Sequence, residues 1–375
     1  MKKLLPILSI VILVSCNGKQ VEESSESVNF LENLTYSSDT IIIDSGQELF
    51  NLSGLVHLST QADDAKFIFQ FDEKQSKVQK IDLDSKSLVG SFEFEKEGPN
   101  GTGKYLSNFQ SLAQDRFLIV SDEAQGIFNT DGTKELDLRL ANFSHSENDS
   151  QKEIQLPFEM QLSPDGKFAY AIVGDFFDGN WNFVRINLET KSLKTWDMPE
   201  FLYSKNFTIM LKGSDFFDLR AEDIHLNKLN EKVAVTVGNT SSIYSYDPES
   251  DSLYFMDFPH ELTAKEKTGT YSLEVTSKKE YDDIISEIRS EITYETFVWD
   301  TSRDKYFRLG NKIIRDSKKS EVFLYAYDKE LNLIDEQKIE GLEKMPSHYF
   351  FKDGNLYSYV NVEDELGFAV FTFDF

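Results

Sequence analysis

The sequence predicts an all-β fold made of repeated four-stranded sheets, and three observations lead to this prediction. Short apolar or alternating runs separated by polar turns fill the chain from about Ser37 to its end, which is the pattern of strand-rich domains. One unit recurs: an aromatic or β-branched strand that closes on Asp or Asn, a polar turn, and a second strand. The 31 Phe and 16 Tyr residues supply strand-forming side chains for a large core.

Six copies of the recurring unit define the architecture. Clear copies read "KIDLDSKSLVGSF", "RINLETKSLKTW" and "YSYDPESDSLYF". The closing residues are Asp82, Asn129, Asn187, Asp247, Asp328 and Asp374, which are 47, 58, 60, 81 and 46 residues apart. Because each interval divides into about four strands, we expect a six-bladed β-propeller with four-stranded blades.

The end of the chain predicts how the ring closes. The last unit stops after its third strand, Phe368 to Asp374, and a strand signal at Thr40 to Leu52 precedes the first complete unit. Pairing of this N-terminal strand with the C-terminal blade would cover an otherwise exposed sheet edge. We therefore expect one closed propeller domain over residues 37–375.

The longest interval contains the one helical periodicity of the chain. Tyr281, Ile284, Ile285 and Ile288 recur at helical spacing, which predicts a helical insertion at about 261–295. The narrow apolar stripe favours a helix packed on its own propeller. A lid or a partner-binding helix is the alternative.

The first residues predict export and lipidation. Lys2 and Lys3 precede an apolar run, Leu4 to Val14, which is too short to cross a bilayer core of about 30 Å as a helix. The run ends in "LVSC", which resembles a bacterial lipobox. We expect a signal peptide over residues 1–15, a lipid on Cys16 and a flexible tether over residues 16–36. Because Asn17 is not an aspartate retention signal, we place the protein at the outer membrane, on its periplasmic or surface-exposed side.

Composition excludes several classes of function. Cys16 is the only cysteine, so the mature domain has no disulfide, no thiolate zinc site and no cysteine nucleophile. Lys and Arg number 39 against 65 Asp and Glu, for a formal charge of −26. Nucleic acid is disfavoured as a partner because phosphate binding needs a positive surface. The membrane would be reached through the lipid anchor.

Several motifs together resemble a known family. The lipobox, "IIIDSG", "KEGPNGTG", "LSPDGKFAYAI" and "FVWDTSRDKYFRLG" are similar to those of an uncharacterised family of six-bladed propeller lipoproteins from Bacteroidota-type bacteria. The "SPDGK" turn also resembles the turns of TolB-like propellers. The resemblance covers nearly the whole chain. It implies a fold and a location, and no mechanism, since the family has no established activity.

Loop length predicts which face of the propeller carries function. The longer loops join the second and third strands of a blade, or one blade to the next, and these connections share one face. "EGPNGTG", "GDFFDGNWNF" and "GSDFFDLR" lie there, so a carboxylate could bind Ca²⁺ or an aromatic ring could stack on a sugar or a peptide. The alternative is structural turns, with Phe between blades and Asp in solvent. We expect ligand contact at Glu97, Asn100, Asp175, Asp178, Trp181, Asp218 and Arg220.

No motif identifies a reaction. The sequence has no nucleophile elbow and no phosphate-binding loop, and its five histidines (His57, His145, His225, His260 and His348) lack metal-ligand spacing. The pattern favours a non-catalytic binding or scaffold module for a glycan, a peptide or an envelope protein, with no evident cofactor and Ca²⁺ as the candidate metal. One alternative is a hydrolase or lyase that uses acidic residues and a divalent metal at the central channel. A sensory or assembly subunit is another.

Overall fold

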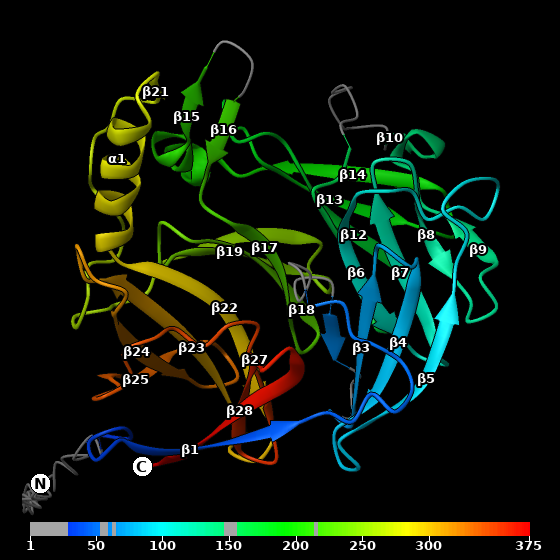
Figure 1. Ribbon diagram of the computed structural model, residues 1–375. Helices are drawn as coiled ribbons and strands as arrows, with labels where there is room; N and C mark the ends of the chain where they lie inside the picture. The colour runs from blue at the N-terminus through cyan, green and yellow to red at the C-terminus, as the bar shows by residue number, and fades with distance from the viewer. Residues whose placement is uncertain (1–28, 53–58, 62–64, 146–155, 214–216) are drawn as a thin grey trace, which may run out of the picture.

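A computed structural model describes residues 29–52, 59–61, 65–145, 156–213 and 217–375. The predicted signal peptide, Cys16 and most of the predicted tether lie outside the described residues. The described part is all-β, with seven sheets and one α-helix, α1 (Figure 1).

Six of the seven sheets in the described part share one plan, in which neighbouring strands run antiparallel. The first sheet contains β2 (Ser59–Gln61), β3 (Phe67–Asp72), β4 (Lys77–Asp82) and β5 (Ser87–Glu93). The second contains β6 (Leu106–Leu112), β7 (Arg116–Ser121), β8 (Gln125–Phe128) and β9 (Lys134–Asp137). The third contains β11 (Glu159–Leu162), β12 (Phe168–Val173), β13 (Asn182–Asn187) and β14 (Ser192–Asp197), with β10 (Ser144–His145) added in parallel.

The other three sheets of this plan follow in the second half of the chain. The fourth contains β17 (Ile224–Leu229), β18 (Lys232–Val237), β19 (Ile243–Asp247) and β20 (Ser252–Met256). The fifth contains β22 (Thr293–Asp300), β23 (Lys305–Ile313), β24 (Ser320–Tyr327) and β25 (Leu333–Lys338). The sixth contains β26 (Phe350–Lys352), β27 (Asn355–Val362), β28 (Glu365–Asp374) and the N-terminal β1 (Thr35–Ile42).

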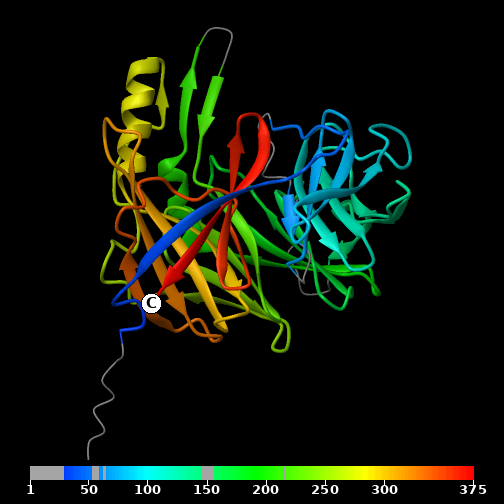
Figure 2. The same cartoon turned by 60° about the horizontal axis from the view of Figure 1, so that its bottom comes forward.

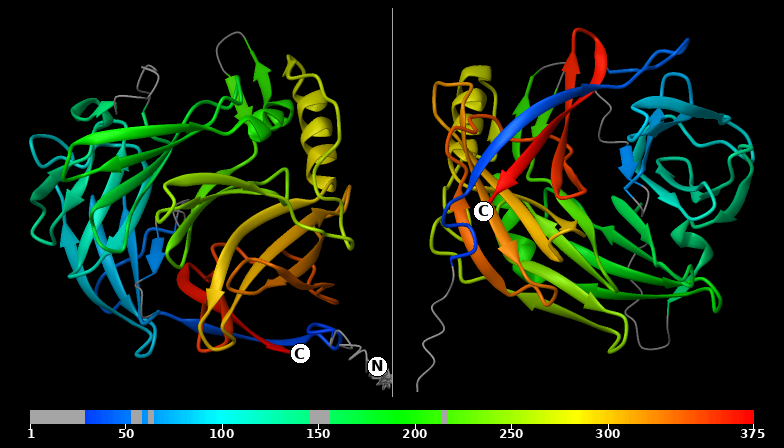
Figure 3. Two further views of the ribbon diagram at one scale, coloured as in Figure 1. Left: turned by 180° about the vertical axis from the view of Figure 1, so that it is seen from behind. Right: turned by 90° about the horizontal axis from the view of Figure 1, so that it is seen from below.

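The sheets are arranged radially in chain order, as in a β-propeller. In the two views of Figure 3, the colour changes around the molecule from blue through green and orange to red, so the sheets follow one another in chain order. The first strand of one sheet contacts the first strand of the next, in the series β2, β6, β11, β17, β22 and β26. The predicted all-β propeller is therefore confirmed at the level of architecture.

The N-terminal strand joins the last sheet. β1 pairs antiparallel with β28, with Thr35 opposite Asp374 and Ile42 opposite Gly367 (Figure 2). The prediction placed this strand several residues later, at 40–52. The Ile43 N–H still donates to Leu366 O of β28 at 2.9 Å, and the chain then leaves β28 because Asp44 bridges to Ser87 of the first sheet.

The ordered body begins earlier than the sequence predicts. Residues 29–36 were expected to belong to the tether, yet Leu31 is fully buried and its N–H donates to Asp335 Oδ2 at 2.6 Å. The rings of Phe30 and Phe375 lie 5.0 Å apart. Phe30 and Leu31, two apolar residues in an otherwise polar stretch, therefore pack on the last two sheets.

Insertions between the sheets build an accessory layer beside the propeller. The seventh sheet contains β15 (Ile209–Lys212), β16 (Phe217–Arg220) and β21 (Glu274–Val275). It lies next to α1 (Lys278–Ser290) and the 3-10 helix η3 (Pro199–Phe207). A second 3-10 helix, η2 (Leu140–Asn142), follows the second sheet. Ser277 caps α1 by accepting from Glu280 N–H. Tyr281, Ile285 and Ile288 pack on residues of β15, β21 and η3. The helix thus packs on its own chain, as its narrow stripe favoured.

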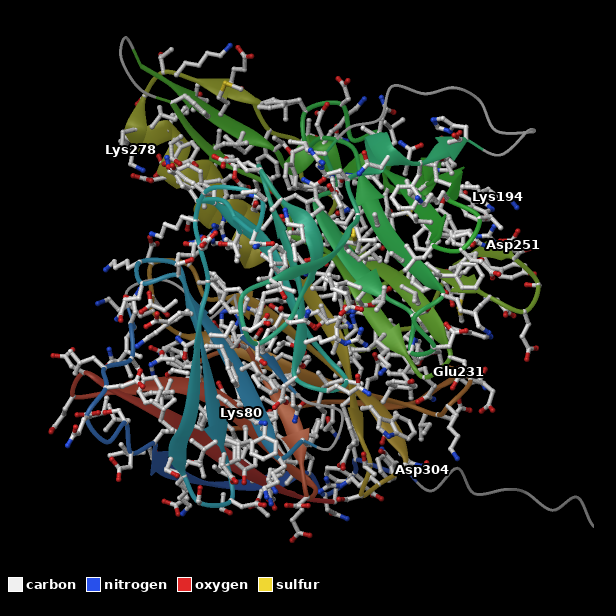
Figure 4. The ribbon with its side chains drawn as sticks, turned by 90° about the vertical axis from the view of Figure 1, so that its right-hand side faces the viewer. Lys80, Lys194, Glu231, Asp251, Lys278 and Asp304 are labelled. Atoms are coloured by element: carbon white, nitrogen blue, oxygen red, sulfur yellow. The ribbon has the colours of Figure 1, made fainter. Side chains whose placement is uncertain are left out.

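Ion pairs tie neighbouring sheets together near their short turns. Lys194 of β14 lies 3.0 Å from Asp251 in the turn before β20, and Figure 4 shows the two side chains together at one edge of the molecule. Arg185 of β13 also pairs with Asp251. Lys80 of β4 pairs with Asp115 of the second sheet at 2.8 Å. These contacts are partly exposed, so they align the sheets more than they stabilise them.

Candidate functional site

Two cavities contain predicted ligand residues. Both are lined in part by the longer loops, which join one sheet to the next or join the second and third strands of a sheet. The β13–β14 pocket has a volume of about 570 Å³ and lies over the third sheet, beside η3. The α1 pocket has a volume of about 260 Å³ and lies between α1 and the fourth and fifth sheets. Three of the predicted ligand residues line the first cavity, and one lines the second.

The β13–β14 pocket has apolar walls and carboxylates. Its apolar lining comes from Leu140, Val173, Val184, Leu193, Met198 and Leu202. Its acidic groups are Asp175, Asp178 and Asp197. This combination suits a ligand with an apolar body and a cationic or hydrogen-bond-donating group.

The two predicted carboxylates of this pocket differ in whether they already accept hydrogen bonds from the protein. Asp175 Oδ1 accepts from the N–H groups of Phe177 and Asp178 at 2.7 and 3.0 Å, so it shapes the loop before β13. The side chain of Asp178 is exposed, and no hydrogen bond or ion pair holds it among the described residues. Asp178 is therefore the carboxylate of the pair that is available to a ligand.

Trp181 departs from its predicted role. Its loop position predicts an exposed ring, but the residue is only 2% exposed. Its ring lies 5.0 Å from that of Phe176 and 6.1 Å from that of Phe158, and its Nε1–H donates to Ser204 Oγ at 3.4 Å. Trp181 is a core residue that forms part of the pocket wall rather than a stacking platform.

Glu97 and Asn100 lie outside both cavities. Asn100 Oδ1 accepts from Lys134 N–H at 3.1 Å, which fixes the loop to β9. Glu97 pairs on the surface with Lys104 at 3.5 Å. Gly103 has φ +81°, and a Cβ there would lie 2.4 Å from Ser121 Oγ. Gly103 therefore has a structural role in this loop, because a larger side chain would not fit there.

The two near copies of the Asp-Phe-Phe-Asp motif can be compared at their second Phe. Phe177 of the first copy is 53% exposed and Phe217 of the second, on β16, is 71% exposed, while Phe176 packs on Trp181. Asp218 is exposed on the same strand and lines neither cavity. Arg220 ends β16 and lines the α1 pocket. The structure thus does not gather the predicted residues at one place.

A buried ion pair lies in the wall of the α1 pocket. Lys267 Nζ lies 2.6 Å from Glu222 Oε1, and the side chains are 1% and 8% exposed. The backbone N–H of Lys267 donates to Asn239 O at 2.9 Å, so the same residue fastens the long loop before α1 to the loop after β18. The pair satisfies both charges internally.

His225 is held in its charged form beside this pair. Its Nδ1–H donates to Glu159 Oε1 at 2.6 Å, while Glu159 Oε2 accepts from Leu226 N–H at 2.6 Å. Burial alone would lower the pKa of His225. The hydrogen bond and charge of Glu159, with the charges of Asp223 and Glu295, outweigh burial and raise the pKa to about 9.

Glu295 occupies a β-bulge that faces the same cavity. The register of β22 against β23 shifts between Tyr294 and Phe297, and such a bulge re-aims side chains. Arg308, which is fully buried, donates to the carbonyls of Glu295 and Ser241 and so holds the bulge in place. Burial raises the pKa of the Glu295 carboxyl.

Apart from Arg220, sequence analysis missed the charged residues of the α1 pocket. Glu222, Lys267, Arg289 and Glu295 lie on four separate segments that only the fold brings together. The available signal was the run "AEDIH", in which Glu222 and Asp223 immediately precede β17 and His225 lies within it. His225 was interpreted as an ordinary strand histidine.

Metal clusters and membrane-spanning helices are both absent from the described ranges. No group of three or more His, Cys, Asp or Glu residues there is placed to hold a metal ion. No helix there is long and apolar enough to cross a membrane.

Comparison with known proteins identifies the family. The model of DUF4221, a domain of unknown function, matches residues 27–338. The chain belongs to this family. A DUF4221 member from Bacteroides vulgatus ATCC 8482 is similar in structure, with a TM-score of 0.57 at 13% identity over 91% of this chain and 98% of that one. A protein from Bacteroides fragilis NCTC 9343 gives a TM-score of 0.51 at 11% identity over 93% and 97%. No curated protein matches this DUF4221 chain.

Proposed function

We propose that this protein is a non-catalytic binding module of the bacterial envelope that holds a small ligand in the β13–β14 pocket. The observation that carries the proposal is the meeting of Asp175, Asp178 and Trp181 at one cavity of about 570 Å³. A volume of this size is within the range of small-molecule sites, roughly 300 to 1,000 Å³.

The lining indicates the class of ligand. Aliphatic side chains of η2, β13, β14 and η3 line one part of the cavity, and Asp178 offers a free carboxylate. Burying an apolar body would provide most of the affinity, and a charge-assisted hydrogen bond to Asp178 would orient the ligand. An amine on an aromatic or aliphatic body, free or on a larger glycan or peptide, meets both requirements.

Calorimetric titration with two matched probes tests this class. Phenethylamine should bind the wild type, and phenylacetate, which has the opposite charge on the same ring, should not. Asp178→Asn should weaken phenethylamine binding by about tenfold, and Asp218→Asn, an exposed acid outside both pockets, should leave it unchanged. Equal binding to all three proteins would contradict the proposal. Repeating the titration with Ca²⁺ and with EDTA tests whether Asp175 and Asp178 hold that ion instead.

The lipid anchor is part of the proposal. The positive residues, the short apolar run and the terminal "LVSC" support cleavage before Cys16 and acylation of its thiol. An alkynyl fatty acid fed to the native host should label the wild type and not Cys16→Ala. Equal labelling would exclude the anchor, while retention in the outer-membrane fraction would support the proposed location.

We also propose that the six similar sheets are six blades of a closed ring. Three observations support closure. The N-terminal β1 pairs with β28 inside the last sheet, and two contacts join this sheet to the first one: Gln61 Nε2–H donates to Phe351 O at 3.5 Å, and Lys352 pairs with Asp84 at 2.8 Å. Deletion of residues 368–375 should abolish the cooperative unfolding transition, whereas deletion of residues 17–28 should preserve it. An unchanged melt in the first variant would contradict closure.

A hydrolase or lyase at the α1 pocket is the second candidate. The observation that favours it is the placement of His225 and Glu295, two groups with shifted pKa values, in one cavity. Activity against glycan and ester substrates that Glu295→Gln abolishes without loss of folding would establish this candidate. Equal activity in the variant and the wild type would remove it.

A further inference from the structure

We propose that the α1 pocket binds a small zwitterion of amino-acid size, with its carboxylate on Arg220 and Arg289 and its ammonium group on Glu295. This site is separate from the β13–β14 pocket and does not depend on the function proposed for it.

The arginines of the pocket are the first observation. All eight arginines of the chain lie in the described ranges, and six of them bind a carboxylate or a backbone carbonyl. Arg220 and Arg289 are the two for which no hydrogen bond or ion pair is found there, and both line this one cavity. Both residues are exposed, so their guanidinium groups are accessible to a carboxylate that enters from solvent.

The two arginines are brought together by separate elements. Arg220 ends β16, and Arg289 lies in the last turn of α1. Burial and the nearby charge of Arg220 lower the pKa of Arg289. A bound carboxylate would relieve this repulsion, and guanidinium groups match its geometry with paired hydrogen bonds.

The free carboxylates of the pocket are the second observation. Glu295 and Asp223 both line the cavity, and within the described ranges neither carboxylate accepts a hydrogen bond or joins an ion pair. The other charges nearby are already matched, since Glu222 binds Lys267 and His225 binds Glu159. The pocket therefore presents unmatched charges of both signs, and a plain anion would satisfy only one of them.

The apolar part of the lining suits an aliphatic side chain. Phe207, Ile285, Ile288 and Ile313 supply an apolar wall in a cavity of about 260 Å³. The volume is too small for a glycan and suits one amino acid. L-Leucine is therefore the appropriate probe, because its side chain is aliphatic and it carries both charges.

Calorimetry of the full mature chain with three probes tests the proposal at pH 7. L-Leucine should bind, whereas 4-methylpentanoate, which lacks the ammonium group, and L-leucinamide, which lacks the carboxylate, should each bind at least about tenfold more weakly. Arg289→Gln and Arg220→Gln should each weaken leucine binding by a similar factor. Arg315→Gln is the matched control, since Arg315 pairs with Glu287 outside the pocket.

Glu295→Gln separates a zwitterion site from an anion site. This variant should lose most of its affinity for leucine and keep its weak affinity for 4-methylpentanoate. Equal binding of leucine and 4-methylpentanoate to the wild type would overturn the proposal, as would the absence of leucine binding to a wild type with a cooperative melt. Normal leucine binding by Asp178→Asn would show that this site is independent of the β13–β14 pocket. Should one arginine variant fail to fold, the other arginine and Glu295→Gln still decide the outcome.

Discussion

Two cores between neighbouring sheets differ in chemistry, and the difference indicates where the molecule is specialised. Between the first and second sheets, phenylalanines dominate: Phe69, Phe71, Phe94, Phe109, Phe117 and Phe128. Between the fourth and fifth sheets, the core includes four buried tyrosines, Tyr294, Tyr306, Tyr325 and Tyr327. The first core has no polar groups to orient its side chains, whereas in the second the hydroxyl groups of Tyr294, Tyr325 and Tyr327 are hydrogen-bonded and so fix side-chain positions. The hydroxyl group of Tyr306 is buried with no partner among the described residues.

The polar core lies directly beneath the α1 pocket. Thr263 Oγ1 is 2.9 Å from Tyr294 OH and 2.8 Å from Tyr325 OH. A hydrogen bond of 3.1 Å joins Tyr327 OH and His260 Nε2, and His260 Nδ1 lies 2.8 Å from Glu336 Oε2. Tyr294 also lines the pocket. Polar packing therefore coincides with a possible site of chemistry, and the apolar core is remote from it.

The largest effect is expected in the apolar core. Phe117 is fully buried and its ring contacts those of Phe69, Phe92, Phe94 and Phe109. Phe117→Ala should lower the free energy of unfolding by about 4 kcal/mol, because it leaves a cavity that rigid sheets cannot fill. Urea denaturation measures the change. Phe117→Leu should cost less than half as much, and an equal loss in both variants would show that the cavity is not the cause.

The next effect tests the polar region through Lys267. Lys267→Met leaves Glu222 buried without its partner and should cost about 3 kcal/mol. Adding Glu222→Gln should restore a large part of this loss, since an amide tolerates burial better than a lone carboxylate. Losses that simply add in the double variant would show that the pair is not coupled.

A smaller, pH-dependent effect is expected at His225. The ordinary pKa of histidine is about 6.5, and in the folded protein the pKa is raised to about 9. The pair with Glu159 therefore stabilises the fold fully below pH 6.5, and this stabilisation is lost as the pH rises through 9. Because the side chain is 40% exposed, solvent screens the pair and the effect is modest.

Urea denaturation from pH 6 to pH 9.5 measures the contribution of the His225–Glu159 pair to stability. The difference in stability between the wild type and His225→Gln should shrink across this range. A difference that stays constant would contradict the shifted pKa.

The smallest effect is expected at Glu97. Its side chain is 76% exposed, and its contact with Lys104 is 3.5 Å long. Glu97→Ala should change the free energy of unfolding by no more than about 0.5 kcal/mol and should leave phenethylamine and leucine binding unchanged. Loss of binding of either ligand in Glu97→Ala would show that this loop contributes to a binding site.

Local patterns predicted the architecture better than the sites. Strand endings such as Asp82 and Asp247 recur because a tight turn follows each one, so short-range chemistry revealed the repeat. Trp181 could not be placed in the same way, because its burial depends in part on Phe158 and Ser204 in other segments. The α1 pocket is harder still, since its charges meet only after two insertions pack on two sheets.

The pairing of β1 with β28 sets a constraint on the order of folding. Residues 35–42 are synthesised well before their partners, residues 367–374. The final sheet therefore cannot be complete until β28 has been synthesised, and β1 has no partner strand before then. Contacts of such long sequence separation slow folding and extend the time during which strand edges are open to aggregation. The edge of β1 is therefore open to association with other chains for as long as β28 is absent.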